Sequence, residues 1–400
     1  MPTAIARLGT ALWGTFVFLS AATSMAAQPV PAAVSAFTGK FGNLYSLFEH
    51  RQFAELDRQI SQIQKNYEAG KVTDQDLLDA YRAIYNPNVV PDYFYDDWVK
   101  QFPKSHAAHV MRGLHYKILA HKARGGQFSN QTPQANFDKM DQLYRMAYPD
   151  LQVSLGMTRK PVMAYYTLLD MANHVASRDQ KRQLYENAIK AVPDSFILRR
   201  QYMHTLETRW GGSIGEMADF LNDCKDKGLS KDQMNVLEAM VYKDQGWIAF
   251  QAEQYAVALP QLTKSAALVS GKEQLMAPSA AAETFGEIGD SYLRTGKNAD
   301  AVVWYTRALT VAGGCDCEDH YYANRGLAQE RLGHVDDAMR DYITGADKGN
   351  DWAQSLLGVY YWKGTHVPVD KKKAAHYMKM AVDQGEEAAI KNWPLLQKEL

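Results

Sequence analysis

Cysteine is scarce in this 400-residue sequence, and neither sign of charge is in excess. Three cysteines are too few for a disulfide-stapled framework, so an apolar core must hold the fold, and 46% hydrophobic residues are enough for one. Lysine and arginine number 44 against 45 aspartates and glutamates, a formal net charge of −1. Without a basic surplus, the composition gives no support for binding to nucleic acid or to an anionic membrane surface.

Strings that bind catalytic metals or nucleotide cofactors are also missing. The sequence contains no His-Glu-x-x-His and no Gly-x-Gly-x-x-Gly. Two pairs of adjacent carboxylates, Asp96-Asp97 and Glu386-Glu387, would point about 100° apart on a helix, which does not suit an acid–base pair. We therefore predict no catalytic residue and no cofactor.

The N-terminal residues are typical of a secretory signal peptide. Arg7 precedes an uncharged and mostly apolar run from Leu8 to Ala22, and Ser24-Met25-Ala26 matches a small-x-small cleavage site. The run is too short for a stable membrane span, although an uncleaved anchor is the alternative. We predict a signal peptide over residues 1–26 and a mature protein in the periplasm or outside the cell.

Helical spacing of apolar residues extends from residue 44 onward. Apolar residues that step by three and four between Phe53 and Tyr67 share one face of a predicted helix, with Gly70 near its end and Thr73 capping the next helix. No convincing run of alternating apolar and polar residues predicts a strand. The fold class is therefore all-α. Further helices are predicted at about 106–123, 134–148, 161–176, 180–191 and 196–208, with prolines between them, including Pro149.

Three segments of the C-terminal half repeat one pattern of small and aromatic residues. A glycine precedes an alanine by twelve residues in each, and aromatic residues such as Tyr292 and Tyr305 flank them. The pattern resembles the tetratricopeptide repeat, a helix pair of about 34 residues in which small residues allow the helices to touch. The resemblance implies an α-solenoid of stacked helix pairs over residues 231–400. The three intervals are Gly246 to Ala258, Gly289 to Ala301 and Gly326 to Ala338.

The last unit has a longer spacing. Gly358 and Tyr361 open it, and Ala374 follows Gly358 by sixteen residues instead of twelve. This spacing resembles the Sel-one-like variant of the repeat, which has a longer turn between its helices. We expect this unit to cap the array, since a solenoid end needs a polar outer face.

The N-terminal half carries one string that could bind a ligand, Arg209-Trp210-Gly211-Gly212-Ser213. Paired glycines bring backbone N–H groups close to an anion, and Arg209 and Trp210 could add contacts beside Ser213. A helix stop explains the same residues, with Ser213 capping the next helix. The string resembles an uncharacterised bacterial domain of unknown function that is often joined to tetratricopeptide repeats. That resemblance covers about residues 40–250 and implies a helical domain over 27–230.

Histidines and cysteines provide two further candidates. His106, His109, His115 and His121 crowd into one predicted helix, where we expect surface or partly buried side chains without a shared metal. Cys315, Cys317 and His320 form a weak zinc or copper candidate. The alternatives to a metal site are a local disulfide, a disulfide from one of these cysteines to Cys224, and free thiols.

The leading functional hypothesis is an exported, noncatalytic repeat scaffold that binds a protein or peptide in the cell envelope. An envelope enzyme or a cell-wall carbohydrate binder, with its site near Arg209 to Ser213, is the alternative. Association of the chain with itself through repeat faces is a third possibility.

Overall fold

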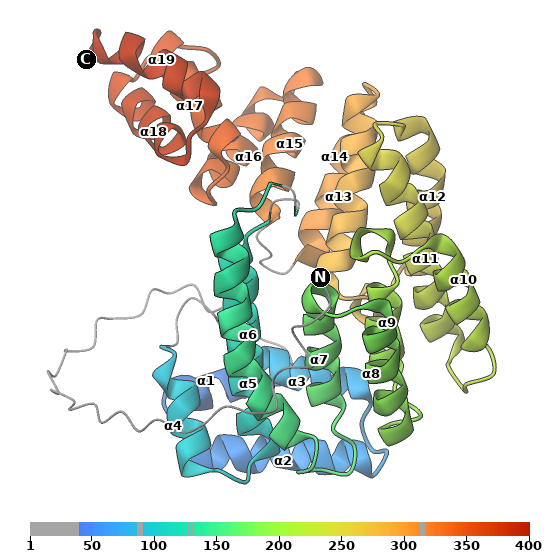
Figure 1. The fold of residues 1–400 in the computed structure, drawn as a ribbon. Helices are drawn as coiled ribbons and strands as arrows, with labels where there is room; N and C mark the ends of the chain where they lie inside the picture. The colour runs from blue at the N-terminus through green and yellow to red at the C-terminus, as the bar shows by residue number, and fades with distance from the viewer. Residues whose placement is uncertain (1–39, 86–90, 127–128, 130, 313–316) are drawn as a thin grey trace, which may run out of the picture. The chain divides into compact units, whose positions relative to one another are not determined.

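The computed structural model describes residues 40–85, 91–126, 129, 131–312 and 317–400, so the predicted signal peptide lies outside the described residues. These residues form 19 α-helices and no strand, which confirms the all-α prediction (Figure 1). The chain divides into two compact units, unit 1 up to Leu229 and unit 2 from Ser230 to Leu400. Among the described residues, no helix combines the length and apolarity that crossing a membrane requires.

Unit 1 contains ten α-helices and one short 3-10 turn in its described residues. These are α1 (Gly42–Glu49), α2 (Phe53–Glu68), α3 (Asp74–Ile84), α4 (Tyr93–Gln101), α5 (His106–Arg124), α6 (Gln134–Ser154), α7 (Val162–Val175), α8 (Arg178–Ala191), α9 (Phe196–Thr205), η2 (Thr208–Trp210) and α10 (Ile214–Asp223).

Two predictions for the start of unit 1 are confirmed: the helix that buries one apolar face from Phe53 onward, and the cap at Thr73. Helix α2 begins at Phe53 and buries Leu56, Ile60 and Tyr67 on one face, as their spacing predicts. Thr73 caps α3 through a capping box, in which its hydroxyl accepts from the Asp76 backbone and the Asp76 carboxylate accepts from the Thr73 backbone.

The prediction that Pro149 separates two helices is wrong, because α6 continues through it to Ser154. A proline in a helix interior removes one backbone hydrogen bond and costs about 3 kcal/mol. Packing beyond the proline offsets this cost, since Asp150 and Leu151 are buried. Gly113 of α5 allows the close approach, because a Cβ there would lie 2.8 Å from the Leu151 side chain.

Contacts between residues far apart in sequence hold unit 1 together. The Asp74 carboxylate at the start of α3 accepts from the Ser195 hydroxyl (2.8 Å) and from the Ile197 backbone (2.9 Å) at the start of α9. The buried Arg200 guanidinium donates to the Gln75 side chain at 3.1 Å. The starts of α3 and α9 are thus joined through buried polar groups.

Unit 2 consists of helix pairs followed by one final helix. Its elements are α11 (Lys231–Gln251), α12 (Tyr255–Leu268), η3 (Glu273–Leu275), α13 (Pro278–Arg294), α14 (Asn298–Ala312), α15 (Glu318–Arg331), α16 (Val335–Asp347), α17 (Asp351–Lys363), α18 (Lys371–Gln384) and α19 (Glu387–Gln397).

One packing contact recurs in all four pairs. A glycine in the first helix faces a large side chain in the second, so close that a Cβ would lie within 3.1 Å of it. The repeat-signature alanines of the second helices, Ala258, Ala301, Ala338 and Ala374, are buried beside these contacts. The four contacts are Gly246 with Leu262, Gly289 with Tyr305, Gly326 with Tyr342, and Gly358 with Met378.

The last pair has the longer turn that its spacing predicts. Three residues separate the helices of each of the first three pairs, whereas residues 364–370 separate α17 from α18. The turn starts at Gly364, which ends α17 in the left-handed conformation, and finishes at Asp370, which caps α18. Unit 2 is therefore a tetratricopeptide-like array whose last pair differs by an inserted turn.

Candidate functional site

The string from Arg209 to Ser213 forms the link between α9 and α10. Gly211 adopts a φ of +82°, and Gly212 lies so close to Leu206 that a Cβ would approach its carbonyl oxygen to 1.9 Å. Ser213 caps α10, accepting from the Glu216 backbone at 3.2 Å and donating to the Glu216 carboxylate at 2.8 Å. Each of these three residues has a structural role in ending one helix and starting the next.

Arg209 and Trp210 lie against buried polar groups of unit 1. The Arg209 guanidinium donates to the buried Glu207 carboxylate at 2.7 Å, and His204 contacts the same carboxylate at 3.0 Å. The Trp210 ring meets the His174 ring edge-on, with centroids 4.9 Å apart. The backbone of the string is held as well, since Lys181 donates to the Trp210 carbonyl at 3.0 Å.

The string also contains the spacing Gly-x-Ser-x-Gly from Gly211 to Gly215, a match that the sequence reasoning overlooked. In hydrolases this spacing places the serine on a sharp turn between a strand and a helix. Here the turn follows a 3-10 turn, and the Ser213 hydroxyl is engaged with Glu216. The local geometry is that of a helix cap rather than of a nucleophile.

A groove of about 880 Å³ lies among α8, α9 and α10 of unit 1. Gly212 lines it, whereas Arg209, Trp210 and Ser213 do not. Three aromatic rings form part of its wall. The Tyr185 and Tyr202 rings stack with centroids 4.1 Å apart, and Phe220 packs edge-on against both.

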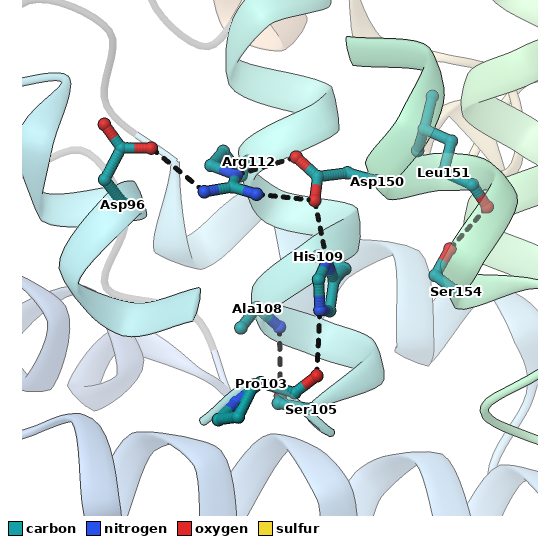
Figure 2. Close-up of polar contacts among 9 residues, drawn as sticks. All are labelled: Asp96, Pro103, Ser105, Ala108, His109, Arg112, Asp150, Leu151 and Ser154. Atoms are coloured by element: carbon teal, nitrogen blue, oxygen red, sulfur yellow. Dashed lines mark hydrogen bonds and ion pairs between the residues drawn. The ribbon is translucent and has the colours of Figure 1, made fainter. Parts of the chain in front are cut away.

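A buried ion-pair network joins α4, α5 and α6 (Figure 2). The Asp150 carboxylate accepts two hydrogen bonds from Arg112, at 2.7 and 2.8 Å, and lies 2.6 Å from His109 Nδ1. His109 Nε2 faces the Pro103 carbonyl at 3.1 Å, so both ring nitrogens face acceptors. The hydrogen bond to Asp150 raises the pKa of His109. A doubly protonated His109 fits this geometry. Asp96 completes the network at 3.0 Å from Arg112.

A second polar cluster lies between α5, α7 and α9. Asp170 is paired with Lys117 and accepts from the Gln201 amide at 3.1 Å. Burial opposes ionisation of Asp170, but Lys117 lowers its pKa well below the ordinary value. Burial lowers the pKa of His121 to about 3 and that of His174 to about 4, so both are neutral at pH 7.

The expectation of surface or partly buried histidines is wrong for His106, His109 and His115, which are 9%, 9% and 1% exposed. Each is buried because another element supplies an acceptor for its ring. Ser154 supplies a carbonyl to His106, and Asp92 a carboxylate to His115. Within the described part of the chain, no group of three or more His, Cys, Asp or Glu residues could hold a metal ion.

The cysteines are placed only in part. Cys317 is disulfide-bonded, Cys224 is buried with a free thiol, and Cys315 lies outside the described residues. A sulfur in a disulfide has no thiolate to offer a metal. His320, the third residue of the metal candidate, instead contacts Asp290 at 3.3 Å. That carboxylate raises the pKa of His320 against the opposing effect of burial.

Polar contacts join the first helix of each repeat pair to the first helix of the next. We call the residues that make them the first-helix row. Each contact joins two side chains at 2.8 Å or less. They are Lys243 to Glu283 between α11 and α13, Asn324 to Asp290 between α15 and α13, and Tyr360 to Glu330 between α17 and α15.

The sequence reasoning missed the residues that give unit 1 its polar interior. Asp150 and Asp170 follow 41 and 49 residues after His109 and His121, too far apart for any helical spacing to connect them. The crowding of histidines in one helix was the available signal. In the sequence these histidines resemble a surface feature, because their partners lie on other elements.

No family model and no curated protein matches the chain, so the resemblance of residues 40–250 to an uncharacterised bacterial domain stays a prediction. Among solved structures, the chain is similar to a signal transduction ATPase with numerous domains, with a tetratricopeptide repeat sensor, from Pyrococcus horikoshii. The TM-score is 0.38 and the identity 11%, and the alignment covers 92% of this chain and 52% of that one. The chain thus spans about half the length of that protein.

Proposed function

We propose that the protein is a noncatalytic scaffold that binds a protein or peptide partner through the repeat array of unit 2. The observation that carries this proposal is the glycine contact repeated in all four helix pairs. Stacked helix pairs of this kind build an extended surface, and such surfaces act by holding peptides or proteins.

The first-helix row is the part of this array that we assign to the partner. Its contacts join successive first helices, so its side chains follow one another along the array. Carboxylates are prominent in it, with Glu283, Asp290 and Glu330 contributed by α13 and α15. Complementary charge steers association and selects partners, so the row favours a partner with a basic segment.

Affinity capture with the mature chain as bait tests this proposal. The captured protein is identified, purified and titrated against the full mature chain, with a Kd in the micromolar range or tighter expected. Charge reversal by Glu283→Lys also breaks the pair with the buried Lys243, and it should weaken binding about tenfold or more while the unfolding midpoint stays above the assay temperature. The matched control Asp300→Lys makes the same change at an exposed position of α14 and should leave binding unchanged. Equal effects of the two variants, or no partner at all, would contradict the proposal.

Export to the cell envelope is part of the same proposal. The N-terminal residues support it by their signal-peptide pattern, and the disulfide at Cys317 is a bond typical of oxidising compartments. Intact mass measurement of the protein recovered from a periplasmic fraction should give a chain that begins at Ala27. Recovery of the uncleaved chain in the cytoplasm would contradict export.

The groove among α8, α9 and α10 supports a second candidate, an envelope enzyme or carbohydrate binder near the string. Its stacked tyrosines offer flat faces of the kind that ligands use. Because Arg209 and Trp210 do not line the groove, substituting Tyr185, whose ring does, tests the second candidate, and substituting Arg209 and Trp210 tests the helix stop. Lost turnover or glycan binding with unchanged unfolding supports the second candidate. Simple destabilisation supports the helix-stop interpretation.

A further inference from the structure

The groove among α8, α9 and α10 carries charges of both signs that face the solvent. Two arginines one turn apart in the first half of α8, Arg178 and Arg182, line it and are exposed. Two aspartates one turn apart in the second half of α10, Asp219 and Asp223, also line it and are exposed. Residues four apart share one face of a helix, so each pair presents its two charges together. A molecule in solution can reach both pairs.

The two pairs follow each other along the groove. Arg178, at the start of α8, lies 3.4 Å from Glu216 in the first turn of α10. Farther along both helices, the Tyr185 ring packs edge-on against Phe220, with centroids 5.4 Å apart. The two helices therefore run alongside each other in the same direction. Between Glu216 and Asp223, α10 rises about 10 Å. The groove thus has a basic end and an acidic end.

The charges at the two ends do not neutralise each other. Within the described residues, Arg182, Asp219 and Asp223 form no ion pair, and Arg178 contacts Glu216 and the Gly211 carbonyl. The last turn of α10 contains no basic residue, so the negative end of its helix dipole adds to the charge of the aspartates. Opposite charges that share a groove without pairing leave room between them for a molecule that contacts both.

The lining as a whole carries five basic and five acidic side chains, so its net charge favours neither an anion nor a cation. An ion of one sign would meet only one of the two ends. A molecule with one charge of each sign, about 10 Å apart, complements both. Between the ends, the partly exposed Tyr185 offers the side of its ring to an apolar group.

We infer that this groove binds a short peptide of about three residues with free ends. Its carboxylate meets Arg178 and Arg182, since guanidinium groups bind carboxylates through paired hydrogen bonds, and its ammonium meets Asp219 and Asp223. Three residues of extended chain span about 10 Å. The groove volume of about 880 Å³ lies in the range of small-molecule sites.

The inference names a ligand class for the groove that the second candidate function uses, and it rests on that groove being a binding site. It does not depend on the partner of the repeat array, because all of these residues belong to unit 1.

Isothermal titration of the full mature chain tests the inference. The probes are trialanine and trileucine, each also as its N-acetyl form and as its C-terminal amide. We expect at least one free tripeptide to bind with a millimolar or tighter Kd. Each blocked form should bind at least about fivefold more weakly, because blocking removes one of the two charges. No binding of either tripeptide, or equal affinity of free and blocked peptides, would overturn the inference.

Cellobiose, titrated in the same way, separates this inference from the second candidate function. We expect it not to displace a bound tripeptide. Binding of cellobiose without binding of a tripeptide would overturn the inference and leave a carbohydrate site in the groove intact.

Two variants at exposed positions locate the two ends of the peptide. Asp223→Asn should weaken the free tripeptide about fivefold and leave the affinity of the N-acetyl form unchanged, because both changes remove the same ion pair. Arg182→Gln should weaken the free tripeptide in the same way and leave the C-terminal amide unchanged. The midpoint of unfolding should stay the same in both variants, since both side chains are exposed.

Asp179→Asn is the matched control, because Asp179 is exposed on α8 but does not line the groove. Its affinity for every probe should equal that of the unmodified chain. An equal loss in Asp179→Asn, or a further loss for the N-acetyl form in Asp223→Asn, would place the binding elsewhere and overturn the assignment.

Discussion

The two units bury their helices by different means. Unit 2 repeats one contact four times, between a glycine and a large side chain sixteen residues later, or twenty in the last pair. Unit 1 uses contacts that occur once each, between residues such as Asp74 and Ser195 that are 121 positions apart. Repetition suits an extended binding surface, whereas unique long-range contacts can enclose buried polar networks.

The difference extends to the histidines. Unit 1 buries His106, His121 and His174 as neutral rings whose pKa values lie well below 6.5. In unit 2, the Asp290 carboxylate raises the pKa of His320. Burial in unit 1 therefore opposes protonation of these three rings, in contrast to His109, whereas unit 2 favours protonation of His320. Acid should act on the two units in opposite directions.

The largest expected effect is the loss of folding stability in unit 1 on acidification. A histidine whose pKa is lowered in the folded state binds a proton more readily when the chain is unfolded. Its contribution to the free energy of unfolding is therefore complete above pH 6.5 and declines as pH falls toward about 4. In that window each such histidine lowers the free energy of unfolding by up to about 1.4 kcal/mol per pH unit. Between pH 7 and 5, unit 1 should lose about 4 kcal/mol in total, because His109, with its raised pKa, opposes the trend.

Hydrogen exchange followed by mass spectrometry at pH 7 and pH 5 measures both units in one chain, after correction for the intrinsic exchange rate. Helices α5, α7 and α9 should lose protection strongly, and α13 and α15 should not. Equal loss of hydrogen-exchange protection in both units would contradict the proposed difference between them.

The next effect separates two adjacent glycines of unit 1. Gly212→Ala should destabilise unit 1 by about 4 kcal/mol, because its Cβ would lie 1.9 Å from a backbone oxygen that no rotamer change can move. Gly211→Ala is the control, since no atom lies within 4 Å of its Cβ and only the positive φ is penalised, by about 1 kcal/mol. Urea unfolding of both variants gives the difference. A similar cost for the two would refute the close-approach argument.

These glycines also show how far the sequence could predict the structure. The tetratricopeptide-like array was predictable, because its contacts recur at fixed short intervals and a repeated interval is visible in one sequence. Ser213 was predictable as a cap, since capping depends on the next few residues. The facing charges of the groove among α8, α9 and α10 were not, because Arg182 and Asp223 lie on different helices and each helix alone looks like an ordinary solvated one.

Asp150→Asn tests the long-range network of unit 1. The substitution leaves Arg112 and His109 without their shared carboxylate, and breaking a buried pair in this way costs about 3 kcal/mol. Asp96 is the other partner of Arg112, and its side chain is 52% exposed. Asp96→Asn should therefore cost well under 1 kcal/mol. Urea unfolding at pH 7 measures both. A larger effect for Asp96→Asn would contradict the assigned roles.

Gly289→Ala makes the corresponding test in unit 2. Its Cβ would lie 2.8 Å from the Tyr305 ring, which must shift, at a cost of about 2 kcal/mol. The damage should stay local, with faster hydrogen exchange in α13 and α14 and little change in α17 and α18. Gly296→Ala, at φ +77° with no atom near its Cβ, is the control for backbone strain alone. Loss of protection spread evenly over both units would show that the array does not behave as separate pairs.

The smallest effect gives the sharpest test of repetition. The hydroxyls of Tyr305 and Tyr342 donate to Asp290 and Glu330, respectively, in the first helix of their own pair, at 2.5 and 2.6 Å. Each Tyr→Phe substitution should cost about 1–2 kcal/mol. Because the two hydrogen bonds share no partner, the double variant should equal the sum of the single variants within about 0.5 kcal/mol. The same cycle on His109 and Arg112 should be non-additive by 1 kcal/mol or more, because both bind Asp150. Additivity of the His109 and Arg112 substitutions, or coupling between the Tyr305 and Tyr342 substitutions, would show that sharing of a carboxylate does not decide which contacts are coupled.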